Sequence, residues 1–238
     1  MPILTESQIK EVYFRQIGGF PPLNQTQDRT NFAREVKDYN GQKKLCIACT
    51  QLDSEAYSER EKKRVLLEWI DFLSINTKVF RALHFNSRVP QALLDAACCQ
   101  ENLEELRFKW GGYSDLTALE KLKKLKFLYV GQGSSVKDIT PISRMKSLVV
   151  LYVESFKKIE DYSPLSSLDN LEQLVISGPI LGTTPIKDLE FLREMQELRS
   201  LGLGNLKFRK KYTSAEIADL RAALPNLHDI NNCAFGDN

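Results

Sequence analysis

The sequence lacks an apolar run close to the roughly 18 residues that a membrane-spanning helix needs. Its first ten residues also lack the apolar stretch of a secretory signal, and they include Glu6 and Lys10. These absences argue against a membrane-inserted or secreted protein. The cytoplasm is therefore the expected location of the chain.

Cysteine is sparse, and the 238 residues include an odd number, five. An odd count gives no complete disulfide framework, and Cys98 and Cys99 are adjacent within an apolar stretch, so reduced thiols are expected. Cys46 and Cys49 have the spacing of a zinc or redox pair, but no second pair of ligands with suitable spacing accompanies them. A glycine-rich phosphate-binding motif is missing too. We expect neither a metal site nor a cofactor.

The chain also lacks a strong charge of one sign, since its formal net charge is +2. This balance does not indicate nucleic acid or an acidic membrane as the partner of the whole chain. Two local basic runs are present, and a solvated rim is the simpler explanation of both. They comprise Lys121, Lys123, Lys124 and Lys126 and, further on, Lys207, Arg209, Lys210 and Lys211.

An internal repeat dominates the last two thirds of the chain. The pattern apolar-x-x-apolar-x-apolar occurs six times, and its first positions follow one another after 23, 22, 23, 23 and 27 residues. Periods of about 20 to 29 residues are typical of leucine-rich repeats, in which each unit adds one short strand to a curved parallel sheet. A degenerate seventh copy ends at Asn232. The six copies are Phe80/Leu83/Phe85, Leu103/Leu106/Phe108, Leu125/Leu128/Val130, Leu148/Leu151/Val153, Leu171/Leu174/Ile176 and Leu198/Leu201/Leu203.

An aspartate recurs ten residues before the next repeat begins, at Asp115, Asp138, Asp161 and Asp188. After the first three, Thr or Ser follows two positions later, with Pro next in two copies. This chemistry predicts a turn that starts a short helix on the outside of the arc. The carboxylates form a regular array, but their recurrence with the repeat favours a turn role over catalysis.

The stretch DITPISRMKSLVVLYV, which begins at Asp138, resembles the internalin/SDS22-like bacterial-type repeats of the leucine-rich repeat family. The resemblance covers roughly residues 77 to 235. It implies an α/β fold, a solenoid with a curved parallel sheet and short helices or turns on the convex side. It also implies a scaffold that holds a partner in its concave face.

One feature of that family is missing, namely the asparagine three positions after the last strand leucine. Its side chain usually satisfies buried backbone groups by stacking along the solenoid. We therefore expect a less regular solenoid than the family norm, with one residue inserted after several strands. The residues at the asparagine position are Arg88, Gly111, Gly133, Phe156, Pro179 and Leu206.

Residues 1–76 do not follow the repeat and are expected to form a mainly helical N-terminal cap, because an open solenoid end exposes its core and unpaired strand groups. Residues 77–238 then form about six repeats and a degenerate C-terminal cap. Apolar spacing predicts the remaining elements. They are helices over Thr5–Ile17, Asn31–Tyr39, Ser54–Leu73 and Thr213–Leu224 and a strand over Lys44–Thr50.

Strand alternation places the residues between the buried leucines on the concave surface. Large side chains gather there on three neighbouring strands, which at a spacing of about 4.8 Å form a patch roughly 10 Å across. Aromatic residues flanked by arginine dominate binding energy at protein interfaces, so this patch is the predicted partner-binding site. The alternative is that an N-terminal segment folds back over Phe127 and Tyr129. The predicted site comprises Arg107, Lys109, Trp110, Phe127, Tyr129, Tyr152 and Glu154.

A second candidate is the long connection Ser177–Lys187, which lengthens its repeat. It is expected to expose Ile180 and Leu181 at the rim of the solenoid. A contact loop and a tolerated surface insertion explain it equally well.

Taken together, the patterns favour a non-catalytic protein-interaction module that binds a protein partner on its concave face. It would act as an adaptor, a regulatory subunit or an inhibitor or immunity protein, with an enzyme or toxin as partner; the SDS22 resemblance implies a phosphatase. Catalysis is not expected, because His84 and His228, the only two histidines, fall on the first and last repeat strands. The alternative is a nucleic-acid-binding protein that uses the lysine-rich rims, with the concave aromatic residues as stacking platforms.

Overall fold

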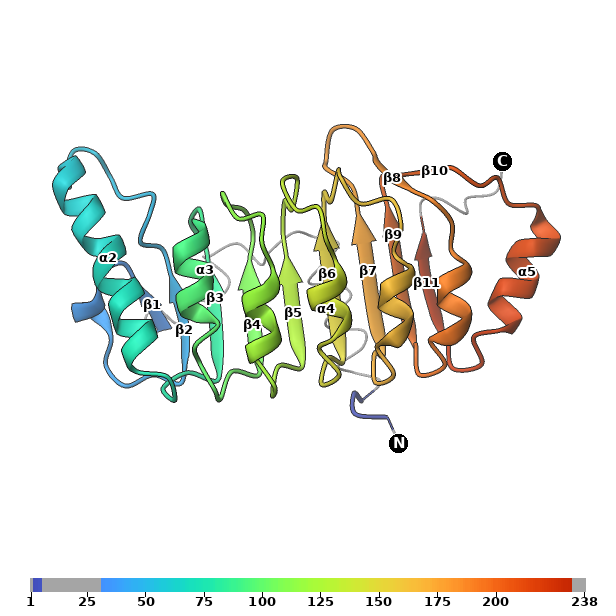
Figure 1. Cartoon of the computed structure of the whole chain (residues 1–238), viewed down its shortest axis with the longest axis horizontal. Helices are drawn as coiled ribbons and strands as arrows, with labels where there is room; N and C mark the ends of the chain where they lie inside the picture. Colours follow the sequence, from blue (N-terminus) through green and yellow to red (C-terminus); the bar gives the residue numbers. More distant parts are fainter. Residues whose placement is uncertain (1, 6–30, 233–238) are drawn as a thin grey trace.

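The computed structural model describes residues 2–5 and 31–232. Within them, nine parallel strands form one sheet in the order β1-β2-β3-β4-β5-β6-β7-β9-β11, so that neighbours in sequence are neighbours in the sheet (Figure 1). A separate parallel pair joins β8 to β10. The strands are β1 (Phe32–Ala33), β2 (Lys44–Ile47), β3 (Ala82–Phe85), β4 (Glu105–Phe108), β5 (Phe127–Val130), β6 (Val150–Glu154), β7 (Gln173–Ser177), β8 (Thr184–Ile186), β9 (Ser200–Gly204), β10 (Leu206–Phe208) and β11 (Asp229–Asn232).

Helices, most of them short, connect successive strands of this sheet and follow one another along one of its faces (Figure 1). Parallel strands need such crossovers because the chain must return to the starting edge before each new strand. The opposite face carries no helix of the described chain, and we call it the helix-free face. The helices are η2 (Val36–Asp38), α2 (Glu59–Ile75), α3 (Gln91–Ala97), η3 (Thr117–Lys121), α4 (Thr140–Ser143), η4 (Ser163–Ser167), η5 (Glu190–Glu194) and α5 (Ser214–Ala222).

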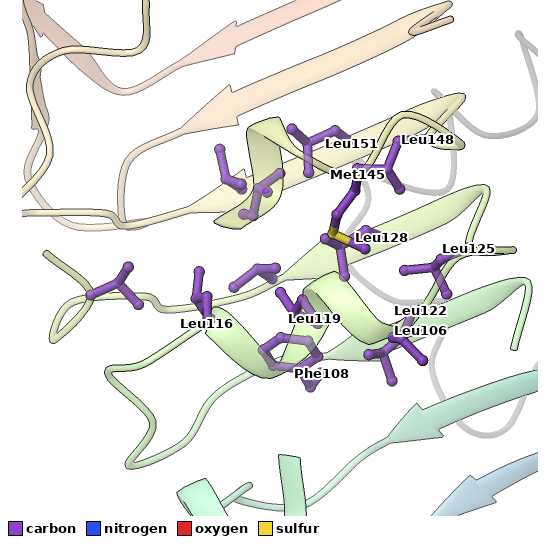
Figure 2. Close-up of a cluster of buried hydrophobic side chains, with 14 of the residues drawn as sticks. Leu106, Phe108, Leu116, Leu119, Leu122, Leu125, Leu128, Met145, Leu148 and Leu151 are labelled. Atoms are coloured by element: carbon purple, nitrogen blue, oxygen red, sulfur yellow. The ribbon is translucent and has the colours of Figure 1, made fainter. Parts of the chain in front are cut away.

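The predicted strand register is confirmed. The middle leucines of the six repeats, from Leu83 to Leu201, lie opposite one another in consecutive strands, and each is at most 2% exposed. Figure 2 shows how leucines of the connecting helices and turns, such as Leu119 and Leu122, pack onto this row. The core is therefore one continuous apolar layer between the sheet and the helices.

The recurring aspartates form turns, as predicted. A carboxylate oxygen of Asp115 accepts a hydrogen bond from the Thr117 N–H at 2.8 Å, and Asp138, Asp161 and Asp188 make the same contact two residues on. Hydrogen bonds from the side chain and the backbone of the Thr or Ser two residues on lower the pKa of the first three carboxyls. The array is thus explained by helix initiation on the outer face.

Backbone groups of the neighbouring repeat take over where the family asparagine is missing. After the strands, Gly133 N–H donates to Glu154 O at 2.9 Å, and Ser155 N–H donates to Ser177 O at 2.7 Å. Gln132, Ser155 and Asn205, which follow β5, β6 and β9, have positive φ angles, and the insertion of one residue after several strands stays a prediction. Gly133 lies so close to the Phe156 ring that a Cβ there would meet it at 2.0 Å.

The helix predicted over Asn31–Tyr39 is wrong. Phe32–Ala33 instead pairs with Cys46–Ile47 as the first strand, and a 3-10 turn follows. One cause is local, because the Asp38 carboxylate accepts hydrogen bonds from the N–H groups of Arg34 and Glu35 at 2.9 Å. The other is tertiary, because Ala33 pairs with β2 and is completely buried.

The other cap elements agree with expectation in type. The strand from Lys44 is shorter than predicted, and the long helix begins at Glu59, where Ser58 and Glu61 form a capping box. The C-terminal helix is confirmed as α5. The helix predicted over Thr5–Ile17 lies outside the described residues, apart from Thr5, and the division at residue 76 stays a prediction. Within the described ranges, no helix is long and apolar enough to cross a membrane.

Candidate partner-binding surface

The pairing of the strands brings the predicted site residues together on the helix-free face. Arg107 lies opposite Tyr129, and Tyr129 lies opposite Tyr152, in three consecutive strands. Phe127 and Glu154 occupy the neighbouring positions of the same face. Lys109 and Trp110 follow β4 directly, at the carboxyl edge of the sheet.

Exposure divides this predicted site into three groups. Lys109 and Trp110 are exposed, the latter with 37% of its surface accessible. Arg107, Phe127, Tyr129 and Glu154 are half-buried. Tyr152 is only 9% exposed, so its ring supports its neighbours and offers little contact surface of its own.

The helix-free face is more open at β4 and β5 than further along. In β4 and β5 half-buried residues alternate with core residues, whereas β6, β7 and β9 are buried on both faces over their first four residues. Leu4, near the N-terminus, packs against Val149 and Val150, and Phe127 packs against the same cluster. Leu4 therefore contributes to the partial burial of Phe127, and the fold-back alternative stays a hypothesis for this surface.

Two tyrosines form the fixed base of the open region. The ring centroids of Tyr129 and Tyr152 lie 4.5 Å apart at 40°, a favourable tilted geometry. Tyr129 Oη donates to Glu154 Oε2 at 2.7 Å, and Tyr152 Oη lies 3.1 Å from Ser177 Oγ. Burial raises the pKa of both phenols, and the Glu154 charge raises that of Tyr129 further. Both hydroxyls are therefore neutral and serve to hold the rings in place.

Arg107 belongs to a charged cluster on β3 and β4 whose other members, His84 and Glu105, were not part of the predicted site. Glu105 accepts a hydrogen bond from Arg107 Nε, and its Oε1 lies 2.9 Å from His84 Nε2. Burial raises the pKa of Glu105, but hydrogen bonds and charge from His84 and Arg107 outweigh it and bring the pKa to about 2. The sequence signal was available, since these residues fall in adjacent concave columns.

This cluster predicts a dependence of stability on pH. Glu105 has a folded pKa of about 2 against an ordinary value of 4.5, so it stabilises the fold above about pH 4.5 and loses that contribution as the pH falls towards 2. Glu105→Gln should cost on the order of 2 kcal/mol at pH 6, less than half of that at pH 3 and little at pH 2. Urea unfolding at several pH values measures the difference.

Glu104→Gln is the matched control for this experiment, because Glu104 pairs with Arg81 at the surface, where ion pairs contribute little. If the gap between wild type and Glu105→Gln stayed constant from pH 6 to pH 2, the cluster would not act as described.

The connection between β7 and β8 adds an apolar element at the same carboxyl edge as Trp110 (Figure 1). Ile180 and Leu181 are 90% and 89% exposed. The base of this loop is fixed, because Asn205 Nδ2 donates to Pro179 O at 3.0 Å. Three strand spacings, roughly 14 Å, separate β4 from β7, so one partner could reach Trp110 and this loop together.

Comparison with solved structures identifies the architecture. Internalin C2 from Listeria monocytogenes is 21% identical, and the alignment covers 70% of this chain and 69% of that one, with a TM-score of 0.52. By its fold, this chain is a leucine-rich repeat protein.

Two further structures align with this leucine-rich repeat protein. An internalin, InlF, from the same bacterium is 25% identical over 66% of this chain and 49% of its own, with a TM-score of 0.47. The plant peptide hormone receptor RGFR1, in complex with RGF2, is 15% identical over 68% of this chain and 25% of its own, with a TM-score of 0.46. The chain thus spans about half of InlF and a quarter of the receptor. Neither a protein-family model nor a curated protein matches it.

The two basic runs of this leucine-rich repeat protein differ in their surroundings. In the second run, Arg209 pairs with Glu160 at 2.6 Å and Lys210 pairs with Glu190 at 2.6 Å, so carboxylates offset much of its charge. In the first run, Lys124 joins a surface groove near the amino ends of β2 to β5. The groove is lined by Lys43, Lys78, Val79, Arg81, Asn102, Glu104 and Lys124.

The Cys46 and Cys49 thiols are poor candidates for chemistry in this leucine-rich repeat protein. Burial raises the pKa of each to about 12, so both are protonated at neutral pH. Among residues 2–5 and 31–232, no group of three or more histidine, cysteine or acidic side chains is placed to hold a metal ion.

Proposed function

We propose that this leucine-rich repeat protein is a non-catalytic interaction module that binds a protein partner at the β4 and β5 end of its helix-free face. The observation that carries the proposal is the exposed indole of Trp110 beside Lys109, next to half-exposed Arg107 and Tyr129. Tryptophan, tyrosine and arginine supply most binding hot spots. The rigid Tyr129 and Tyr152 base lowers the ordering cost of association.

The partner in this proposal offers an apolar pocket for Trp110 and a surface whose charge complements this edge of the sheet. It is an enzyme or toxin in the cytoplasm, with the module acting as its inhibitor, regulatory subunit or adaptor. An inhibitor would use the exposed Ile180 and Leu181 loop as a second contact, because these side chains stand on a fixed loop base. Electrostatic complementarity would then speed association more than it strengthens binding.

The experiment compares capture of proteins from source-cell lysate by wild type and by a Lys109→Ala/Trp110→Ala variant. We expect the variant to lose at least tenfold in affinity for the captured partner, about 1.4 kcal/mol or more. The matched control is Lys63→Ala/Leu67→Ala, an exposed lysine and apolar residue on α2, on the opposite face. Equal affinity of both variants would reject the β4 and β5 surface as the site.

Nucleic-acid binding is the second candidate, and the groove lined by Lys43, Lys78, Arg81 and Lys124 favours it. Phosphate contacts would make affinity fall steeply between low and moderate salt. Titration with a single-stranded oligonucleotide at two salt concentrations, with Lys78→Ala/Lys124→Ala alongside, tests it. Binding that is weak at low salt, or unaffected by the double substitution, would exclude the groove as a nucleic-acid site.

A further inference from the structure

The backbone of the N-terminal residues docks onto a buried ion pair. Leu4 N–H donates to Glu172 Oε2 at 3.0 Å, and Ile3 N–H donates to the other oxygen of the same carboxylate. Arg199 Nη1 donates to the carbonyl of Leu4 and lies 2.9 Å from Glu172 Oε2. Glu172 is 2% exposed and Arg199 is 7% exposed.

The site occupies the amino ends of three consecutive strands. Val149, Glu172 and Arg199 directly precede β6, β7 and β9, and their backbones continue the hydrogen bonding of the sheet. Leu4 is 4% exposed and packs onto Val149 and Val150. Figure 1 shows residues 2–5 below the starting ends of β6 and β7.

The corresponding position in earlier repeats shows that the sheet itself does not need this arrangement. Arg81, Glu104 and Lys126 precede β3, β4 and β5, and none of them is buried. Burying a glutamate and an arginine is costly unless each finds good partners. Here the two charges satisfy each other and together bind two N–H groups and one carbonyl of the N-terminal segment.

A second observation concerns the residue that follows Glu172. Gln173, the next residue, is fully buried, and its side-chain oxygen has no hydrogen-bond partner in the structure. A buried acceptor of this kind normally has a donor. Gln173 directly follows Glu172 in the chain, so an unsatisfied polar group borders the ion pair in the sequence.

We propose that Glu172, Arg199 and the apolar surface of Val149 and Val150 form a binding site for a short peptide segment that carries an aliphatic side chain. In this structure, the chain's own Ile3 and Leu4 occupy the site and so compete with a segment from a partner. The site forms hydrogen bonds with backbone groups and packs against one aliphatic side chain, as in peptide recognition by main-chain hydrogen bonds. The site is distinct from the Trp110 surface and does not depend on it.

Fluorescence polarisation with a labelled, acetylated peptide PILTE, the sequence of residues 2–6, tests the proposal on the full chain. Leu4→Asp places a carboxylate against Glu172 and removes the aliphatic anchor, so it should free the site. We expect this variant to bind PILTE at least tenfold more tightly than wild type. The control peptide PIDTE should bind at least tenfold more weakly than PILTE to the same variant.

Circular dichroism confirms that Leu4→Asp is folded, and hydrogen exchange on wild type gives an independent test if it is not. Excess PILTE should displace the cis segment and speed exchange of the Ile3 and Leu4 amides, whereas PIDTE should not. Equal binding of the two peptides to folded Leu4→Asp, or unchanged exchange in wild type at saturating PILTE, would overturn the proposal.

Discussion

Leu128→Ala should lower the free energy of unfolding by about 2 to 5 kcal/mol. Leu128 is 1% exposed and lies between Leu106 and Leu151 in the row of middle leucines. Figure 2 shows it in the same buried cluster as Met145, which belongs to the next turn of the solenoid. The cavity would open in the centre of the stack, where the neighbouring repeats depend on each other for their buried surface.

Urea unfolding at neutral pH measures this loss. Leu67→Ala is the control, because the same truncation on α2 removes a side chain that is already 47% exposed, and it should stay within about 0.5 kcal/mol of wild type. A loss below about 1 kcal/mol for Leu128→Ala would mean that the repeat collapses around the missing side chain.

The second large effect concerns the buried ion pair. Arg199→Met should destabilise the protein by about 3 to 5 kcal/mol, because it leaves the Glu172 carboxylate buried without its 2.9 Å partner. The double variant Glu172→Met/Arg199→Met removes both charges and should recover much of that loss. The physical reason is that desolvation of an unpaired charge costs more than the pair contributes.

A double-mutant cycle from urea unfolding of wild type, both single variants and the double variant measures the coupling. The Arg107→Met/Glu105→Met cycle gives a comparison for a similar pair that is half-buried, and its coupling should be smaller. Strictly additive losses at Glu172 and Arg199 would show that the two charges do not depend on each other.

Local sequence patterns predicted most of the structure of the repeat region. The spacing of Leu106, Leu128 and Leu151 predicted strands, register and buried face, because in a solenoid each unit contacts only its neighbours and the same local rule applies repeatedly. The aspartate turns were equally predictable, since the carboxylate bonds a backbone group two residues away. The helix prediction for Asn31–Tyr39 was wrong because the strand in this segment forms by pairing with β2, which a pattern within the segment does not include.

The candidate surface was predictable in its alignment but not in its exposure. Alternation placed Arg107, Tyr129 and Tyr152 in one column, and the pairing of β4, β5 and β6 confirms it. Their accessibility depends on packing that no strand pattern contains. The exposure of Phe127 is an example, because the cluster against which it packs includes Leu4, which is far away in the sequence.

The sequence by itself determined the repeat, the strand order and which face of each strand is apolar, because these follow from short-range periodicity and from the stacking of like units. Only the tertiary structure decided which part of the helix-free face is open, and it alone brought Leu4 to Glu172 and Arg199 across 168 and 195 positions of chain. The physical reason is that hydrogen bonds and burial depend on distance in space, and a segment outside the repeat has no period that predicts where it docks.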